Sequence, residues 1–412
     1  MNYALNNAFN TSTNKAAEEA ALAPRALIDA SLGQHDDSVR TTGLILTKEQ
    51  IIDLYRYEQK GLHLPTTAEA VSVYLGYDQQ NPPGRGLAVS DFTKTFSIIK
   101  VHASQWDGLR QRIKLISSEL KLFATFMNTT GKRVVRELDT VSASDALKDL
   151  GIITLEDLKR VEKEMGTALP DITLNDDDKD AVESVSYFLD RILARVDTEE
   201  KRSNRLKADL DAFSRELSNT VRPEISLRLV AIDNNNFKDD VIRLQKEIED
   251  FDKQIDEKSA SYKQMVNDSL SAASKLNVIG LGMAIYFGVE AEKVRKERNA
   301  LKKQRNVKNT EMGTKSTVLR RLNDVKGDMQ DLELLTLQAD VATQNLVTVW
   351  NKLYLYIKTS QEESKRINDA LKVRFLAYHF EQVIEPWALI KDEADDLYAV
   401  FAEADAEIKK YR

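Results

Sequence analysis

The stretch WDGLRQRIKLISSELKLFATFM, residues 106–127, decides the fold class of this chain. Its apolar side chains recur at alternating steps of three and four residues. This spacing is typical of the buried seam of a helix that packs lengthwise against other helices. The members of the seam are Trp106, Leu109, Ile113, Ile116, Leu120, Phe123 and Met127. The stretch therefore predicts a long helix in a coiled-coil bundle.

Three further seams follow toward the C-terminus. The second runs through Val185, Leu189, Ile192 and Val196 and resumes at Leu206, Leu210, Phe213 and Leu217. The third comprises Val241, Leu244, Ile248, Phe251, Ile255, Tyr262 and Met265, and the fourth comprises Leu322, Val325, Met329 and Leu332, then Leu346, Val349, Leu353 and Tyr356. Polar Glu199 and Ser203 interrupt the second seam, so we expect either local solvent exposure or a change of packing partner there.

These patterns predict an all-α fold, an elongated bundle of long antiparallel coiled-coil helices with a small apolar head at one tip. No proline occurs between Pro223 and Pro386, so a hairpin of very long helices is expected in that half of the chain. We divide the chain into a mobile N-terminal lead-in (1–45), a helical tail bundle (46–235 and 310–412) and a long-helix hairpin (236–309). The membrane-directed head lies within the hairpin, at about residues 264–305. Two capping boxes, Thr47 with Gln50 and Thr66 with Glu69, predict short helices before the first seam.

Composition excludes several classes of function. Charged residues make up 30% of the 412 residues, with 15 glycines and 7 prolines, which is typical of long solvated helices. A net charge of −7 argues against a general nucleic-acid binder. Cysteine is absent, and the four histidines do not have metal-ligand spacing, so we expect no disulfide, no metal site, no cofactor and no catalytic residues. Trp106, Trp350 and Trp387 lie in apolar stripes and are assigned to core packing.

The chemically unusual segment, LNVIGLGMAIYFGV, covers residues 276–289 and contains no charge. As a helix it would span only about 21 Å, short of the roughly 30 Å hydrocarbon core of a bilayer. It can enter one leaflet or lie in the interface. The predicted membrane-contact residues are Leu276, Val278, Ile279, Leu281, Met283, Ile285, Tyr286, Phe287 and Val289, and the small or hinge residues are Gly280, Gly282, Ala284 and Gly288.

A basic stretch follows the apolar segment, with eight Lys or Arg residues and one Glu in residues 293–308. Cations beside an apolar segment suit anionic headgroups. The predicted headgroup-binding residues are Lys293, Arg295, Lys296, Arg298, Lys302 and Lys303, and Arg305 belongs to the same stretch. Two plainer interpretations remain open: the apolar segment is a buried core helix, and the basic stretch is the wet face of a charged helix.

The combination of seams, apolar segment and basic stretch resembles the A component of α-xenorhabdolysin-type binary toxins, within the cytolysin-A-like group of α-helical pore-forming proteins. The resemblance covers roughly residues 90–410. It implies a soluble monomer that attaches to a target-cell lipid membrane and assembles with a shorter helical B component into a hetero-oligomeric ring. The partner's hairpin would line the transmembrane path, so this chain need not cross the bilayer.

The expected function is therefore that of a membrane-binding subunit of a two-component pore-forming toxin, with no nucleic-acid partner. The N-terminus lacks the basic and apolar regions of a Sec-type signal, so secretion by another route is expected. The alternative is a non-enzymatic coiled-coil scaffold or spacer whose apolar tip binds another protein.

Overall fold

The computed structural model describes residues 2–32, 42–77, 79–80, 82, 84–142, 145–152, 155–165, 173–233, 239–275, 289–313, 316–365, 367 and 369–411. Within these ranges nearly all of the chain is helical. The one strand-like feature there is an isolated antiparallel bridge between Thr173 and Asp369. The predicted all-α class is confirmed.

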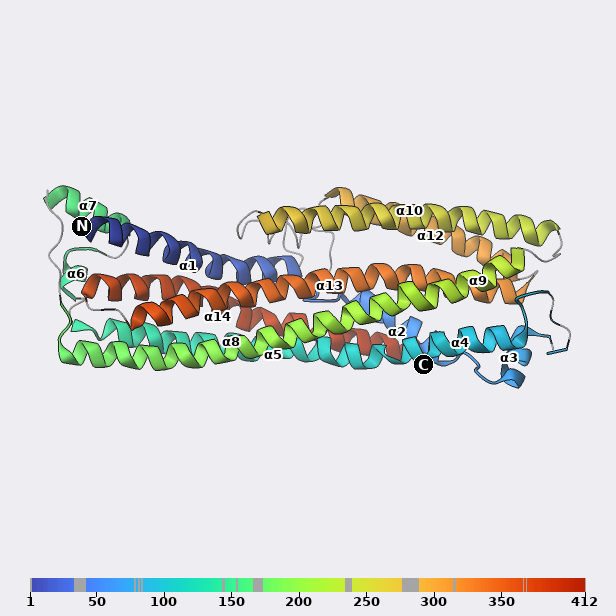
Figure 1. Ribbon diagram of the computed structural model, residues 1–412, viewed down its shortest axis with the longest axis horizontal. Helices are drawn as coiled ribbons and strands as arrows, with labels where there is room; N and C mark the ends of the chain where they lie inside the picture. Colours follow the sequence, from blue (N-terminus) through green and yellow to red (C-terminus); the bar gives the residue numbers. More distant parts are fainter. Residues whose placement is uncertain are drawn as a thin grey trace.

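The helices follow one another in the order shown in Figure 1. The first half contains α1 (Asn2–Leu32), α2 (Lys48–Leu62), α3 (Ala68–Leu75), α4 (Val89–Ser104), α5 (Trp106–Asp139), α6 (Asp145–Asp149), α7 (Leu155–Met165) and α8 (Asp176–Glu216). The second half contains the π-helical turn η2 (Leu217–Val221), α9 (Arg222–Asp233), α10 (Asp239–Lys275), α12 (Val289–Gly313), α13 (Thr317–Ser364), α14 (Ala370–Ile408) and the 3-10 turn η3 (Lys409–Tyr411).

The long helices α5, α8, α13 and α14 form the body of an elongated bundle, as predicted (Figure 1). Two structures cover the same side of this body, one after the other along its length. The first is α1, which packs on α13 and α14. The second is the hairpin of α10 and α12, which packs on the first half of α13 (Figure 1).

The apolar seams of α5 and α8 form the centre of the body. Every predicted member of the first seam is at most 7% exposed, and every apolar member of the second is at most 1% exposed. The three tryptophans are also buried, as predicted. Trp350 and Trp387 stack with their ring centroids 5.7 Å apart, and Phe123 packs edge-on against both, at 4.7 and 4.8 Å. This aromatic cluster joins α5, α13 and α14.

The polar interruption of the second seam is buried and not exposed to solvent. Glu199 and Ser203 are 3% and 1% exposed. Ser203 accepts a hydrogen bond of 3.0 Å from the indole N–H of Trp350, and Glu199 pairs with Arg195 and Arg202. These groups can be buried because each has a partner.

A single proline explains the irregular turn between α8 and α9. Pro223 has no backbone N–H, and its ring crowds the carbonyl four residues earlier. The π-helical turn Leu217–Val221 lies directly before it and widens the helix locally. Leu217 and Val221 remain buried through the turn, so α8 and α9 follow one another without losing the core.

The N-terminal segment differs from the expected mobile lead-in. Residues 2–32 form α1, which packs on α13 and α14. Its core contacts come from small residues at helical spacing together with two larger ones: Ala17, Ala20, Ala23, Leu27 and Ile28. Alanine buries little area per residue, so this face has a weak apolar signal in the sequence although alanine favours helix.

One of the two predicted helix caps is confirmed. Thr47 accepts a hydrogen bond from the Gln50 N–H at 3.4 Å, and the Gln50 side chain accepts one from the Thr47 N–H at 2.8 Å. The second cap lies one residue later than predicted. Thr67, and not Thr66, accepts from the Ala70 N–H at 3.3 Å and begins α3.

The predicted apolar head lies largely in residues 276–288, outside the described residues, so its place at a tip stays a prediction. The two helix ends that flank it are described. The end of α10 and the start of α12 lie along the side of the bundle, about midway along its length (Figure 1). The three-part division of the chain likewise stays a prediction.

His102 provides a pH test of the packing between α2, α4 and α8. Its Nδ1 lies 2.7 Å from the Tyr57 hydroxyl and its Nε2 lies 3.0 Å from the Phe213 carbonyl oxygen, so a neutral ring can donate from Nε2 and accept at Nδ1. Burial lowers the pKa of His102 below its ordinary value, although the Phe213 carbonyl and Glu216 oppose this. Protons therefore bind the unfolded chain more readily than the folded one.

We expect the free energy of unfolding to fall as the pH drops below about 6.5, the ordinary pKa of histidine, because protonation then favours the unfolded state. His102→Gln removes this titration, so its stability should depend less on pH between about 5 and 7. Chemical denaturation at a series of pH values measures the slope. An unchanged slope in the variant would contradict the assignment.

Candidate functional site

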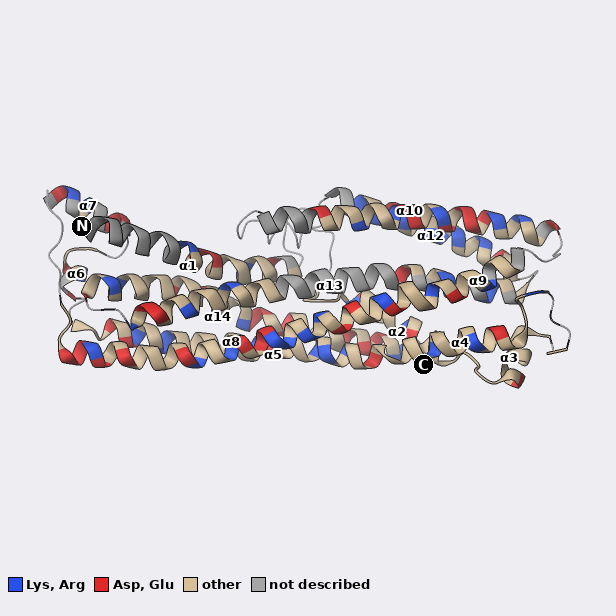
Figure 2. Cartoon of the chain, in the orientation of Figure 1, with Lys and Arg blue, Asp and Glu red and all other residues tan. Residues whose placement is uncertain are grey.

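The hairpin of α10 and α12 is the element that carries the apolar segment. Its two helices pack on each other and on α13. Acidic and basic side chains occur along the described turns of both helices (Figure 2). The contacts that hold this hairpin to the body determine whether it can separate from the body.

The buried seam of α10 is polar at every second position. Its buried residues step by four and three from residue 241 to residue 266, so one helix face is continuously covered. They are Val241, Leu244, Gln245, Ile248, Asp252, Ile255, Ser259, Tyr262 and Val266. The three polar members lie seven residues apart, at one heptad position, while the alternate position is apolar.

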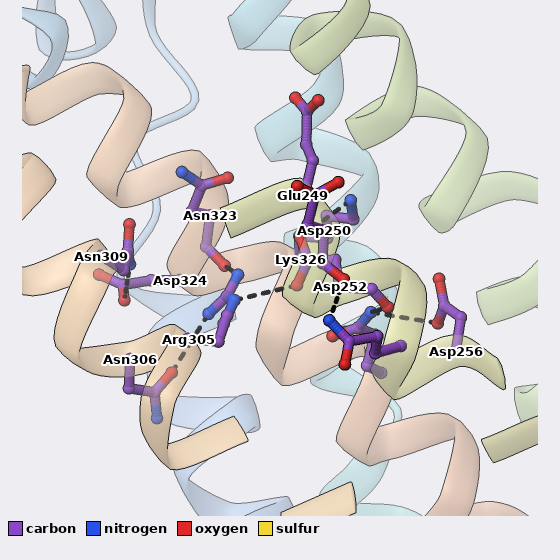
Figure 3. Close-up of polar contacts among 12 residues, drawn as sticks. Glu249, Asp250, Asp252, Asp256, Arg305, Asn306, Asn309, Asn323, Asp324 and Lys326 are labelled. Carbon is purple, nitrogen blue, oxygen red and sulfur yellow. Dashed lines mark hydrogen bonds and ion pairs between the residues drawn. The ribbon is translucent and has the colours of Figure 1, made fainter. Parts of the chain in front are cut away.

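The central polar layer is a buried ion pair (Figure 3). Arg305 Nε on α12 lies 3.0 Å from Asp252 Oδ1 on α10, and both side chains are 2% exposed. Lys326 Nζ on α13 lies 3.0 Å from the second oxygen of Asp252. Arg305 also donates to the Asn323 carbonyl oxygen of α13 and, at 3.3 Å, to Asn306 Oδ1. One guanidinium therefore connects all three helices.

A second polar layer lies seven residues along the hairpin, toward the apolar segment. Arg298 Nε donates to Ser259 Oγ at 2.9 Å, and Arg298 Nη2 lies 2.9 Å from Asp331 Oδ1 on α13. Lys302 pairs with the other oxygen of Asp331. The Arg298 side chain is 3% exposed.

A third polar layer lies on the other side of the central one. Asn323 Nδ2 donates to Gln245 Oε1 at 2.9 Å, and Asn309 Nδ2 donates to Asp324 Oδ1 at 2.8 Å. Together the three layers form the polar seam, which we define as Gln245, Asp252, Ser259, Arg298, Arg305, Asn309, Asn323, Gln330 and Asp331.

A glycine on α13 allows the closest approach in the seam. A Cβ added at Gly327 would lie 2.6 Å from an Arg305 guanidinium nitrogen. This nitrogen belongs to a flexible side chain, but hydrogen bonds on three sides fix its position. Any larger residue at 327 would displace the guanidinium.

The seam is also open to water on one side. A cavity of about 330 Å³ lies between α2, α12 and α13. Its lining is polar and includes Asp53, Lys60, Lys302, Arg305 and Asp331. Burial raises the pKa of Asp53, Lys302 lowers it and Asp331 raises it further. The lining that α2 and the hairpin share in this cavity is therefore polar and charged.

The structure divides the predicted headgroup-binding residues into two groups. Lys293, Lys296 and Lys303 on α12 are exposed. Arg298 points into the seam, as does Arg305. Arg295 is partly buried with contacts of its own, and Lys302 pairs with Asp331. Headgroup binding by these residues stays a prediction.

The predicted membrane-contact and hinge residues cannot be placed, because Leu276, Val278, Ile279, Gly280, Leu281, Gly282, Met283, Ala284, Ile285, Tyr286, Phe287 and Gly288 lie outside the described residues. Val289 is the first residue of α12, and the environment of its side chain is also outside the described part. Among the described helices, none is long and apolar enough to cross a membrane.

The polar seam was missed in the sequence because seams were traced through apolar residues alone. The sequence predicts Arg298 as a headgroup-binding residue and Arg305 as part of the same basic stretch, with the wet face of a charged helix as the alternative. Their seven-residue separation, matched by Asp252 and Ser259 on α10, was the available signal. Extending the heptad register of Ile248 and Ile255 across the polar residues places Asp252 inside.

The contribution of the Asp252–Arg305 ion pair to the free energy of unfolding can be tested with two variants. Asp252→Leu leaves Arg305 buried without a carboxylate, which costs about 3–5 kcal/mol when a buried pair is broken. Adding Arg305→Met in the same chain removes the unpaired charge and should recover most of that loss, because apolar replacement of a buried pair is often neutral or stabilising. Chemical denaturation measures both; equal losses in single and double variants would contradict the pairing.

Comparison with known proteins places this geometry in context. The chain is similar to soluble SmhA of the tripartite alpha-pore forming toxin Smh from Serratia marcescens, with a TM-score of 0.53 and 12% identity, covering 93% of this chain and 96% of that one. It also matches YaxA from Yersinia enterocolitica, with a TM-score of 0.49 and 23% identity over 89% of this chain and 100% of that one. XaxA from Xenorhabdus nematophila matches with a TM-score of 0.44 and 25% identity over 89% and 99%.

No family model matches the sequence, and a search of curated proteins found no match. The similarity to SmhA shows the fold: this chain has the elongated helical fold of α-helical pore-forming toxin components. The resemblance stated from the sequence is thus confirmed at the level of the fold.

Proposed function

We propose that this chain is the membrane-binding subunit of a two-component α-helical pore-forming toxin that acts with a shorter helical B partner to form a lytic pore. The observation that carries the proposal is the pairing of two features on one element. The uncharged segment 276–289 joins the two helices of a hairpin, and that hairpin is held to the body by a polar seam.

The seam suits a hairpin that leaves the body. Separating apolar faces exposes them to water at about 25 cal/mol per Å². Separating polar faces costs less, because water replaces the lost hydrogen bonds and solvates the freed charges. Lys302 and Arg305 line the polar cavity beside α2. Release of the hairpin is therefore the step by which the apolar segment is presented to a bilayer.

The positive charges on α12 also favour release of the hairpin toward an anionic membrane. Lys293 and Lys296 are exposed in the docked state, close in sequence to the apolar segment, and Lys303 is exposed farther along α12. Release also frees Arg298 from Asp331 and Arg305 from Asp252. Each cation near an anionic surface contributes about 1 kcal/mol of attraction.

The length of the apolar segment and the fold of the chain support the need for a partner and the assignment to a pore-forming toxin. Fourteen helical residues cover about 21 Å, less than the roughly 30 Å hydrocarbon core, so a partner completes the transmembrane path in a hetero-oligomeric ring. The fold is that of pore-forming toxin components, and we assign the chain no catalytic role. Before membrane contact the chain is a soluble, secreted protein.

The membrane contact is tested by placing two charges in the apolar segment. Ile285→Asp with Phe287→Asp should abolish co-flotation with anionic and zwitterionic liposomes, because a carboxylate in hydrocarbon costs several kcal/mol. The matched control is Val307→Asp with Leu355→Asp, which are 67% and 54% exposed on α12 and α13. The control should float as the unmodified chain does.

Unchanged flotation of the Ile285→Asp, Phe287→Asp variant would reject the predicted membrane-contact residues. If the unmodified chain binds neither vesicles nor target cells, with or without a B partner, the toxin proposal fails. A stable oligomer in plain buffer, insensitive to detergent, would instead favour the scaffold.

Hairpin release is tested by replacing the central layer with apolar residues. Asp252→Leu with Arg305→Met should keep the fold but raise the cost of separation, so vesicle permeabilisation with the B partner should fall at least about tenfold, equivalent to about 1.4 kcal/mol. The control is Glu199→Leu with Arg202→Leu, which removes an ion pair within α8 between the buried Glu199 and the partly exposed Arg202 and leaves Arg195 paired with Glu119. Full permeabilisation by the seam variant would show that the hairpin stays docked during activity.

A further inference from the structure

On the outer face of α5, two heptad positions carry no charge over seven residues. The α5 ridge consists of the seven outward residues at two heptad positions: Gly108, Gln111, Leu115, Ser118, Leu122, Thr125 and Thr129. Outer heptad positions are normally the most charged part of a coiled coil. The third outer position carries the charges Asp107, Lys114 and Lys121, so the ridge is a charge-free line beside a charged one.

Two large apolar side chains project from the ridge. Leu115 is 51% exposed and Leu122 is 58% exposed, and they lie seven residues apart on the same line of the helix. This spacing is that of successive knobs in a helix–helix contact. The small residues on either side, Gly108 and Ser118 among them, leave room for a second helix to approach closely.

The polar groups of the ridge are already satisfied by their own helix. The Ser118 hydroxyl donates to the Leu115 carbonyl at 2.8 Å, Thr125 donates to the Lys121 carbonyl at 2.9 Å, and Thr129 donates to the Thr125 carbonyl at 2.9 Å. Covering a hydroxyl that keeps its hydrogen bond costs little desolvation energy. The ridge therefore behaves as a more apolar surface than its composition indicates.

The charges beside the ridge are turned sideways and paired within the molecule. Toward α14, Arg110 pairs with Asp405, Lys121 pairs with Asp395, and Lys114 lies over the Tyr398 ring. Toward α8, Arg112 pairs with Asp209, and Glu119 pairs with Arg195 and Arg202. Asp107 is exposed beside Gly108 and accepts a hydrogen bond of 3.5 Å from Gln111. Because the other flanking charges are paired, two copies of the ridge can face one another with little like-charge repulsion, although the whole chain has a net charge of −7.

We propose that the α5 ridge is a contact surface for a second copy of this chain, docked antiparallel about Ser118. In that register each Leu115 lies opposite the other copy's Leu122, Gln111 lies opposite Thr125 and Gly108 lies opposite Thr129. Large residues meet large ones on either side of a small centre, so the pattern is complementary to itself. A two-fold contact of this kind uses the same patch on both partners.

The size of the contact sets its strength. The ridge is about 32 Å long and about 10 Å wide, so two copies bury roughly 600 Å² in total, below the approximately 1,200 Å² of a stable interface. The pair is therefore weak, and the chain is a monomer when dilute. An antiparallel pair directs the two hairpin-bearing halves in opposite directions, so it is a form of the protein in solution that separates before both copies meet one bilayer.

A cysteine-free chain allows a direct test in plain buffer, independent of any membrane activity. Ser118→Cys should form a disulfide-linked dimer about ten times faster than Ser261→Cys under mild oxidation, because pre-association raises the local thiol concentration. Ser261 is the matched control: it is exposed on α10 and its hydroxyl also donates to its own helix, at 3.0 Å. Equal cross-linking rates would overturn the proposal.

Sedimentation of the unmodified chain, at concentrations from roughly 1 µM to roughly 1 mM, should show a monomer that shifts to a dimer. Leu115→Lys with Leu122→Lys places like charges opposite one another and should remain monomeric. Leu355→Lys with Leu389→Lys, at positions 54% and 48% exposed on α13 and α14, should dimerise as the unmodified chain does. A monomer at every concentration, or dimerisation of the ridge variant, would overturn the proposal, as would association with a different protein only.

Discussion

The buried ion pair between Asp252 and Arg305 holds the hairpin to the rest of the molecule. Asp252 and Arg305 are each 2% exposed, and their pairing brings α10, α12 and α13 to one point. Neither charge can stay buried without the other. The seven-residue repeat then sets the positions of the layers on either side, through Ser259 with Arg298 and Gln245 with Asn323.

This constraint divides the molecule into two kinds of packing. The body closes around apolar and aromatic side chains such as Phe123, Trp350 and Trp387, whose separation would expose a large apolar area. The hairpin packs through polar groups that water can also satisfy, alternating with apolar side chains such as Ile248 and Ile255. A protein that must remain folded while one element departs needs this contrast. The same contrast explains why a strongly basic stretch, Lys293 to Arg305, is tolerated against the body: its inward members have buried partners on α10 and α13.

The long helices and the packing of the body could be predicted from the sequence, because apolar residues recur there at the heptad spacing. The seam from Trp106 to Met127 is buried throughout, and the Thr47 cap lies where its capping box predicts. The sequence was insufficient where a core position is polar, since Asp252 and Arg305 are indistinguishable from solvated charges until three helices are in place. It was also insufficient for α1, whose buried face is largely alanine. The apolar segment 276–288 was identified from composition and lies outside the described residues, so membrane contact rests on its chemistry and on the hairpin that carries it.

The account depends on the hairpin leaving α13 when the protein meets a membrane. Spin labels on Gln304 of α12 and Lys60 of α2, two exposed positions on the hairpin and on the body, report the separation of the hairpin from the body. Pulsed dipolar spectroscopy on the doubly labelled chain should give one short distance in buffer and a longer one after vesicles are added. A vesicle-bound protein that keeps the short distance would contradict hairpin release.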